Sequence, residues 1–220
     1  MIPKKPRRAR TKTAIMTVKG EYFDCFDYSP EDIDIEAIAH SLGNQARFNG
    51  HTTRVVSVAE HSLRVAEICL ALARWRDLSP EIGRLLYFLG LMHDAEEGLL
   101  GDIVRPLKTP EQRVVGEGIQ ESIMRKMGRP IPPPPAIEAI VKEADEIALA
   151  FEAYHWQPGA EDWINTLSWK SVPEMEKDLK IWGARLKFPV RGVRRRLRAR
   201  FGNWGKVWLS QVQDGTRIRF

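Results

Sequence analysis

The sequence feature that most constrains the fold of this chain is the helical spacing of its apolar residues. These residues occur in runs that begin just after helix-start signals. Ser57 and Glu60 have the form of a capping box, as do Thr109 and Gln112. Ser79-Pro80 places a proline at a first helical position. The run that follows Ser57 has the i, i+3, i+4, i+7 spacing of a buried helix face, carried by Val58, His61, Val65, Ile68, Cys69 and Leu72. The pattern predicts an all-α fold, a bundle of five or six helices.

The remaining segments complete this prediction. A helix is expected from Ser29-Pro30 to Gly43-Asn44, a long one over 137–151, and a last one from Pro173. Residues 13–28 are expected to be irregular or a short strand, with a turn at 17–20. Residues 130–135 hold five prolines, which predicts an extended connector. Asp214-Gly215 is a hairpin-turn signal and predicts a small hairpin within 207–220.

Composition limits the class of protein. A chain of 220 residues that is 43% hydrophobic can bury a full core. No apolar run reaches the ~20 residues that a membrane-spanning helix needs, so no membrane partner is expected. The two cysteines, Cys25 and Cys69, form no CxxC pair. This cysteine content fits a reducing cytoplasm and argues against a disulfide framework.

Charge divides the chain into three parts. Residues 1–12 carry six Lys or Arg and no acid, and residues 180–220 carry twelve against Asp214 alone. Residues 13–179 have sixteen basic and twenty-eight acidic residues. We therefore expect a basic N-terminal tail at 1–12, a domain at 13–189 and a basic, aromatic extension at 190–220. The extension is expected to pack on the domain or on a second subunit. The basic ends are compatible with nucleic-acid binding or with plain solvation.

Side chains that could bind a metal ion lie on three of the expected helices. His93-Asp94 ends an apolar run, His61 falls on a buried face, and Asp145 borders the stripe of the 137–151 helix. Buried Asp is costly unless it is paired or coordinates an ion. Imidazole and carboxylate are both metal ligands, and helical bundles build core metal sites from facing helices. Three capped helices can therefore bring these four side chains to one ion.

The order and spacing of these residues resemble the HD-domain metal-dependent phosphohydrolase superfamily, whose pattern is H…HD…D. The matching segments are VAEHS at 58–62, LMHDAEEGLLGD at 91–102 and VKEAD at 141–145. The segment IAHSLGNQARFNGHT at 38–52 is similar to bacterial 5′-deoxynucleotidases and phage dATP triphosphohydrolases. The resemblance implies a helical HD domain with a central metal site.

By this resemblance each motif residue receives a role. The implied metal ligands are His61, His93, Asp94 and Asp145, and the implied catalytic carboxylates are Glu97 and Asp102. Arg47 and the aromatic Phe48 match the substrate-binding pair, although many bacterial relatives have Arg-Trp there. Lys108 and Lys142 are candidates for phosphate binding, as is His51 in the substrate-side loop. One divalent ion such as Zn, Co or Mn is expected, with an additional Mg conceivable beside the phosphates.

Several functions stay open. The leading hypothesis is hydrolysis of (deoxy)nucleoside phosphates, by a dNTP triphosphohydrolase or by a 5′-deoxynucleotidase. The enzyme is expected to be a homo-oligomer. A (p)ppGpp hydrolase resembles an HDxxED pattern, which Gly98 after Glu97 does not match. Cyclic-dinucleotide phosphodiesterases need further histidines that this sequence lacks at suitable places. A nucleic-acid-binding protein that uses the basic termini is the alternative from a different class.

Overall fold

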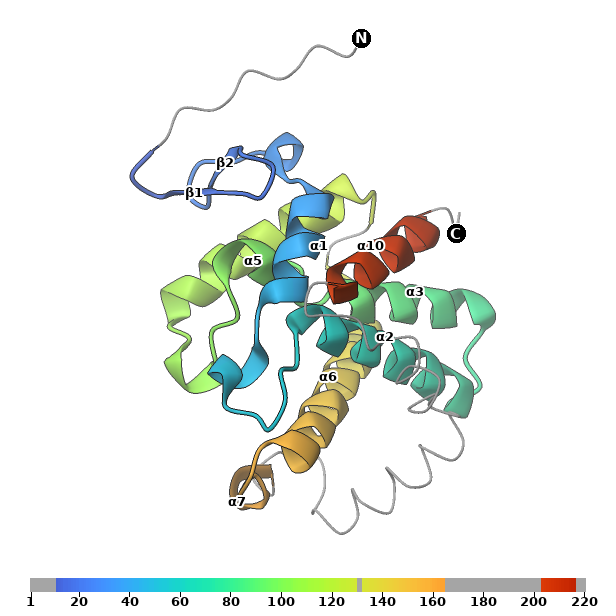
Figure 1. The fold of residues 1–220 in the computed structure, drawn as a ribbon. Coiled ribbons are helices and arrows are strands. Elements are labelled where there is room, and N and C mark those ends of the chain that lie inside the picture. Colours follow the sequence, from blue (N-terminus) through green and yellow to red (C-terminus); the bar gives the residue numbers. More distant parts are fainter. Residues whose placement is uncertain (1–10, 130–131, 165–202, 217–220) are drawn as a thin grey trace.

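Helices dominate the computed structural model, which describes residues 11–129, 132–164 and 203–216 (Figure 1). The elements in chain order are β1 (Ala14–Met16), β2 (Tyr22–Asp24), η1 (Pro30–Asp32), α1 (Ile35–Asn44), η2 (Arg47–Gly50), α2 (Val58–Trp75), α3 (Pro80–Met92), α4 (Glu97–Leu100), η3 (Arg105–Leu107), α5 (Pro110–Lys126), α6 (Pro135–Trp156), α7 (Glu161–Ile164) and α10 (Asn203–Thr216). The predicted all-α fold is confirmed. The helix predicted from Pro173, the N-terminal tail up to residue 10 and part of the proline connector lie outside the described residues.

Three predicted helix starts are confirmed by the hydrogen bonds of their capping side chains. The side chains of Ser57, Ser79 and Thr109 accept backbone N–H groups of the first turns of α2, α3 and α5. The full capping box is present at Thr109, where Gln112 Oε1 accepts the Thr109 N–H at 2.8 Å. At Ser57 the box is incomplete, because the Glu60 carboxylate pairs with two arginines instead.

The first predicted helix begins later than its sequence suggests. Ser29-Pro30 starts only the short η1, and Ile33 is extended with its side chain almost fully buried. Asp34 then caps α1, since its Oδ1 accepts the N–H groups of Glu36 and Ala37 at 2.8 and 2.9 Å. Inserting Ile33 into the core therefore breaks the segment into two helices. Before it, β1 and β2 form a two-stranded antiparallel hairpin, in line with the short strand expected there.

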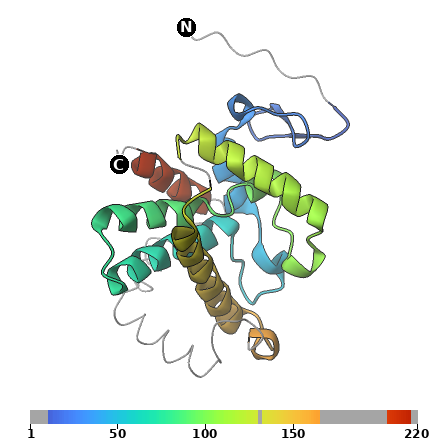
Figure 2. The same ribbon diagram turned by 180° about the vertical axis from the view of Figure 1, so that it is seen from behind.

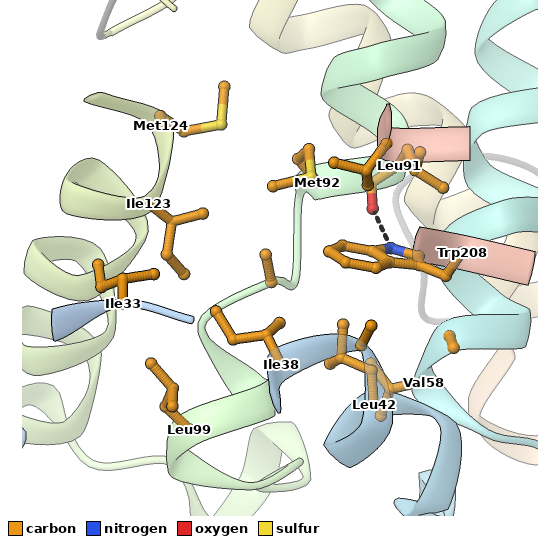
Figure 3. Close-up of a cluster of buried hydrophobic side chains, with 14 of the residues drawn as sticks. Ile33, Ile38, Leu42, Val58, Leu91, Met92, Leu99, Ile123, Met124 and Trp208 are labelled. Atoms are coloured by element: carbon orange, nitrogen blue, oxygen red, sulfur yellow. Dashed lines mark hydrogen bonds between the residues drawn. The ribbon is translucent and has the colours of Figure 1, made fainter. Parts of the chain in front are cut away.

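The hairpin predicted within 207–220 is wrong, because residues 203–216 form α10. Trp204, Trp208 and Val212 recur every four residues, and this apolar stripe outweighs the Asp214-Gly215 turn signal. Trp208 is fully buried in the main core, and its indole N–H donates to the Leu91 carbonyl at 2.8 Å (Figure 3). The described part of the aromatic extension, α10, therefore packs on the domain and lies against α1, α2 and α3.

A close crossing of α2 and α3 positions the residues that follow. A Cβ at Gly90 on α3 would lie 3.0 Å from the Cα of Ala66 and 2.8 Å from Cys69 Sγ, both on α2. Only glycine permits this approach, which brings the C-terminal end of α3 close to α2. The long α6 packs across the same two helices, as the view from behind shows (Figure 2). Among the described helices, none has the combination of length and apolar character that crossing a bilayer requires.

Candidate metal centre

Four side chains from three helices meet beside the α2–α3 crossing. His61 Nε2 lies 3.0 Å from Asp145 Oδ1 and 3.7 Å from Asp94 Oδ2. His93 Nε2 lies 3.0 Å from Asp94 Oδ2 and 3.7 Å from Asp145 Oδ1. His61 comes from the second turn of α2, His93 caps the end of α3, and Asp145 lies in the middle of α6. The structure thus brings together all four residues that the sequence suggested as ligands.

Both histidines are held with the same nitrogen toward this centre. His93 Nδ1 lies 2.8 Å from the Gly90 carbonyl oxygen, which accepts hydrogen bonds only. His61 Nδ1 lies 3.0 Å from Glu152 Oε1, again an acceptor. Each Nδ1 therefore carries the hydrogen, and each Nε2 faces the two aspartates. A histidine that ligates a metal commonly donates its other N–H in this way.

The spacing of the four atoms fits a divalent ion. Ligand bonds of about 2.0–2.2 Å separate neighbouring ligand atoms by about 3 to 3.5 Å. The two separations of 3.0 Å lie within that range and the two of 3.7 Å lie just beyond it. In addition, His93 Nε2 is buried and has no hydrogen-bond partner among the described residues. Two imidazoles and two carboxylates give a donor set suited to Zn²⁺ or a similar transition ion.

Electrostatics at the centre favour a cation. Burial raises the pKa of Asp94, but the adjacent His93 outweighs it and holds that pKa at about 2. For Asp145, the adjacent His61 and His93 overcome the effect of burial and keep its pKa well below the ordinary value. Burial lowers the pKa of His93, yet the two aspartates raise it well above its usual range. Both carboxylates therefore stay ionised and produce the negative potential that a metal ion requires.

The two expected catalytic carboxylates lie beside this centre. Burial, reinforced by Asp94 and Asp102, raises the pKa of Glu97 to about 10, and burial also raises that of Asp102 although Arg47 opposes it. The buried Glu97 Oε2 has no hydrogen-bond partner in the described part of the chain. Gln45 holds this segment, since its amide donates to the Glu97 carbonyl at 2.7 Å and its oxygen accepts the Asp102 N–H at 2.9 Å.

Arg47 reaches the centre from the loop between α1 and α2. Its side chain is 10% exposed, its Nε lies 3.0 Å from Glu152 Oε2, and its NH1 lies 3.7 Å from Asp94 Oδ2. Phe48 follows with φ of 57°, and Asn49 and Gly50 are also left-handed. A bulky residue there costs about 1–2 kcal/mol, so the fold holds this turn against local preference. Strain of this kind is typical of functional loops.

The other suggested substrate residues lie farther from the ligands or nearer the surface. Lys108 Nζ is 3.8 Å from Glu97 Oε1 and 3.9 Å from Glu96 Oε1. Lys142 is exposed one helical turn before Asp145, and His51 is exposed at the end of η2. Lys108 is therefore beside the candidate catalytic group, whereas no contact with the centre is seen for Lys142 or His51 within the described ranges.

Sequence reasoning missed several members of the site. Glu152, fully buried, contacts both His61 and Arg47, and Arg105 NH2 lies 2.8 Å from Asp145 Oδ2. Glu96 is also buried, which together with the charge of Asp94 raises its pKa to about 7. Glu152 had a signal: it stands seven residues, two helical turns, after Asp145 and so on the same face of α6. Arg105 had none, because its loop follows no periodic pattern.

The fold and the centre define a helical domain with a candidate metal site of two histidines and two aspartates between facing helices. The family model for the HD domain matches residues 40–157, more than half of the chain, and the chain belongs to this family. HD domains are generally metal-dependent hydrolases and bind divalent ions.

Two relatives extend the comparison. An uncharacterized protein of Rhodobacter capsulatus is 36% identical over 145 residues, which cover 62% of this chain and 69% of that protein. The uncharacterized protein YfdR of Escherichia coli K12 is 34% identical over 140 residues, covering 63% of this chain and 69% of its own. Both names leave the substrate open.

Proposed function

We propose that this chain hydrolyses (deoxy)nucleoside phosphates, either as a dNTP triphosphohydrolase or as a 5′-deoxynucleotidase. The observation that carries the proposal is the set of four ligand atoms with buried Glu97 and Arg47 beside it. This arrangement offers a hydrolytic centre, a group that handles protons and a fixed positive charge within one site. The resemblance of residues 38–52 to nucleotide hydrolases supports the nucleotide as substrate.

The ligands His61, His93, Asp94 and Asp145 would hold one divalent ion. When bound, such an ion would lower the pKa of a coordinated water, neutralise phosphoryl charge and offset the carboxylate repulsion that adds to burial in keeping Glu97 protonated. Its identity, Zn, Co, Mn or similar, belongs to the proposal, as does an additional Mg beside the phosphates.

Proton transfer, phosphate binding and base binding are assigned to different residues of the chain. Glu97 is not a ligand in this assignment, and it takes the proton of the attacking water. Asp102, held through its backbone by Gln45, carries a proton to the leaving oxygen. Arg47 binds a phosphate oxygen with the guanidinium edge left free by Glu152, and Lys108 adds a second positive charge. Phe48 offers a ring face for the base.

Two features bear on the competing functions. A Cβ at position 98 would lie 3.1 Å from both the Cα and the carbonyl oxygen of Ile38. The second acid of the HDxxED pattern of (p)ppGpp hydrolases would follow Glu97 at this position, where the backbone of α1 leaves no room for it. The basic termini lie mostly outside the described residues, so nucleic-acid binding and homo-oligomer formation stay predictions.

One experiment tests the proposal. Protein loaded with Mn²⁺, Co²⁺, Zn²⁺ or Mg²⁺ is incubated with nucleoside mono-, di- and triphosphates and with (p)ppGpp, and the products are resolved chromatographically. We expect phosphate from a deoxynucleoside monophosphate or triphosphate from a dNTP, and roughly 10²–10⁴-fold slower product formation with Glu97→Ala. Turnover of (p)ppGpp alone, or of no nucleotide with any metal, would overturn it.

A further inference from the structure

Glu152 is the one fully buried carboxylate among the described residues that contacts both a metal ligand and a substrate-binding candidate. Its side chain is 0% exposed. Oε1 lies 3.0 Å from His61 Nδ1 and also accepts a hydrogen bond from Arg64. Oε2 accepts the Arg47 Nε–H at 3.0 Å. Both carboxylate oxygens are therefore engaged, each toward a different part of the site.

The two histidines of the centre are oriented by unequal partners. His93 Nδ1 is held by a neutral backbone carbonyl three residues earlier in its own helix. His61 Nδ1 is held by a charged side chain from another helix, α6. A carboxylate is the stronger acceptor and raises the basicity of the ring nitrogen that faces the ion. The orientation of His61 therefore depends on a residue that can be changed by mutation.

The same carboxylate fixes the direction of Arg47. A guanidinium presents several N–H donors in one plane, so a hydrogen bond at Nε decides where its NH1 and NH2 point. With Nε bound to Glu152, NH1 lies 3.7 Å from Asp94 Oδ2, at the edge of the metal centre. The Arg47 donors that remain are thereby directed toward the place where a phosphate oxygen would approach the ion.

We propose that Glu152 is a positioning residue that holds His61 for the metal and Arg47 for the phosphate at once. The part concerning Arg47 rests on the proposed function, whereas the part concerning His61 needs only a metal. Because one carboxylate serves both side chains, occupation of the metal site and binding of an anion should strengthen each other, and by linkage the effect is reciprocal.

The test compares metal affinity, anion affinity and stability in the same proteins. Apparent Co²⁺ affinity is measured by chelator competition. Binding of inorganic phosphate is followed through the absorption spectrum of Co²⁺-loaded protein, and the melting temperature is recorded for each metal-free variant. These readouts do not depend on which nucleotide is the substrate. Failure of the proposed function in the product assay is therefore distinct from failure of this inference.

The decisive variant is Glu152→Gln. Glutamine keeps the size and shape of the side chain, but its amide N–H₂ is a donor and must face another donor, on an arginine or on His61. We expect Co²⁺ affinity to fall about 10–100-fold, the usual effect of losing the partner of a ligating histidine. Phosphate affinity should also fall, and phosphate should strengthen Co²⁺ binding less than it does in the wild type. Unchanged Co²⁺ affinity would overturn the proposal.

Two control variants separate positioning from packing. Glu143→Gln removes a carboxylate of the same helix that pairs with Arg76 at 2.6 Å, and it should leave Co²⁺ affinity within about twofold. Arg64→Gln removes another partner of Glu152 but not its contacts with His61 and Arg47. It should lower the melting temperature and retain most of the Co²⁺ affinity. If Arg64→Gln loses as much Co²⁺ affinity as Glu152→Gln, the role is general packing and the proposal fails.

Glu152→Asp provides a second route if Glu152→Gln does not fold. The shorter side chain retains the charge but cannot reach His61 and Arg47 together. We expect it to weaken either Co²⁺ or phosphate binding at least about fivefold and to reduce their mutual strengthening. An aspartate variant with both affinities and their coupling intact, or a failure of both variants to fold, would contradict the positioning role.

Discussion

Replacing Glu97 with glutamine should make the metal-free protein more stable, and increasingly so as pH rises. In the folded state burial and the neighbouring carboxylates raise the pKa of Glu97 from an ordinary 4.5 to about 10. A group whose pKa is raised by folding contributes its full stability below its unfolded pKa. It loses that contribution as pH rises toward its folded pKa. The wild-type protein should therefore lose stability between about pH 4.5 and 10, whereas glutamine does not titrate.

The expected magnitude follows from the size of this pKa shift. Each pH unit above 4.5 costs the wild type at most about 1.4 kcal/mol through this group. At pH 7.5 the stability lost through Glu97 is therefore at most about 4 kcal/mol. Because Glu97 titrates together with Asp102 and Glu96, we expect a gain of about 2–4 kcal/mol when it is replaced. For a domain of this size the melting temperature should rise by roughly 5–12 °C.

The assay is a melting series from pH 5 to 8.5 in a chelator, for wild type, Glu97→Gln and Glu143→Gln. The gain of Glu97→Gln should be small at pH 5 and grow with pH, and it should shrink when metal is restored. Glu143→Gln, at an ion pair nearer the surface, should show no such slope. A Glu97→Gln gain that is equal at pH 5 and 8 would refute the reasoning.

Four other predictions concern the ion, catalysis, the core and the tail. His61→Ala or Asp145→Ala should largely empty the metal site in elemental analysis, while the unmutated protein keeps about one ion per chain. Glu97→Ala should retain the metal but lose roughly 10²–10⁴-fold in turnover, and near-normal turnover would remove its assigned role. Trp208→Ala should cost about 3–5 kcal/mol in denaturant unfolding, because the indole is fully buried. Deleting residues 1–12 should leave kcat/KM within about twofold, and a tenfold loss would show that these residues reach the phosphates.

Local signals made the helices predictable. Caps at Ser79 and Thr109 act within one turn, and an apolar stripe fixes which helix face is buried, so both can be read along the chain. The start of α1 was misplaced because the burial of Ile33 is a tertiary effect that overrides the Ser29-Pro30 signal. The hairpin error near Asp214 has the same cause, since the turn signal is local and the packing of Trp208 is not.

The metal centre was partly predictable for a related reason. Ligands recur at fixed places on periodic helices, so His61 and Asp145 could be assigned to inner faces. The side chains that orient them follow no such rule. Gln45 joins residues 97 and 102 across more than fifty positions, and Arg105 comes from a loop. Contacts of this kind depend on how the loops cross, which periodicity does not describe.

The position of α10 has a consequence for how the domain forms during synthesis. Its Trp208 is buried in the main core, where its indole N–H is bonded to the Leu91 carbonyl, and α10 packs against α1. A Cβ at Gly205 would lie 2.0 Å from the Ala39 carbonyl oxygen, so the contact with α1 is immediate. The helices that carry the candidate metal ligands all emerge from the ribosome before α10 does. Until then the nascent chain already contains all four candidate ligands, but the part of the core that α10 covers is exposed. We expect the chain to need protection from aggregation during that interval.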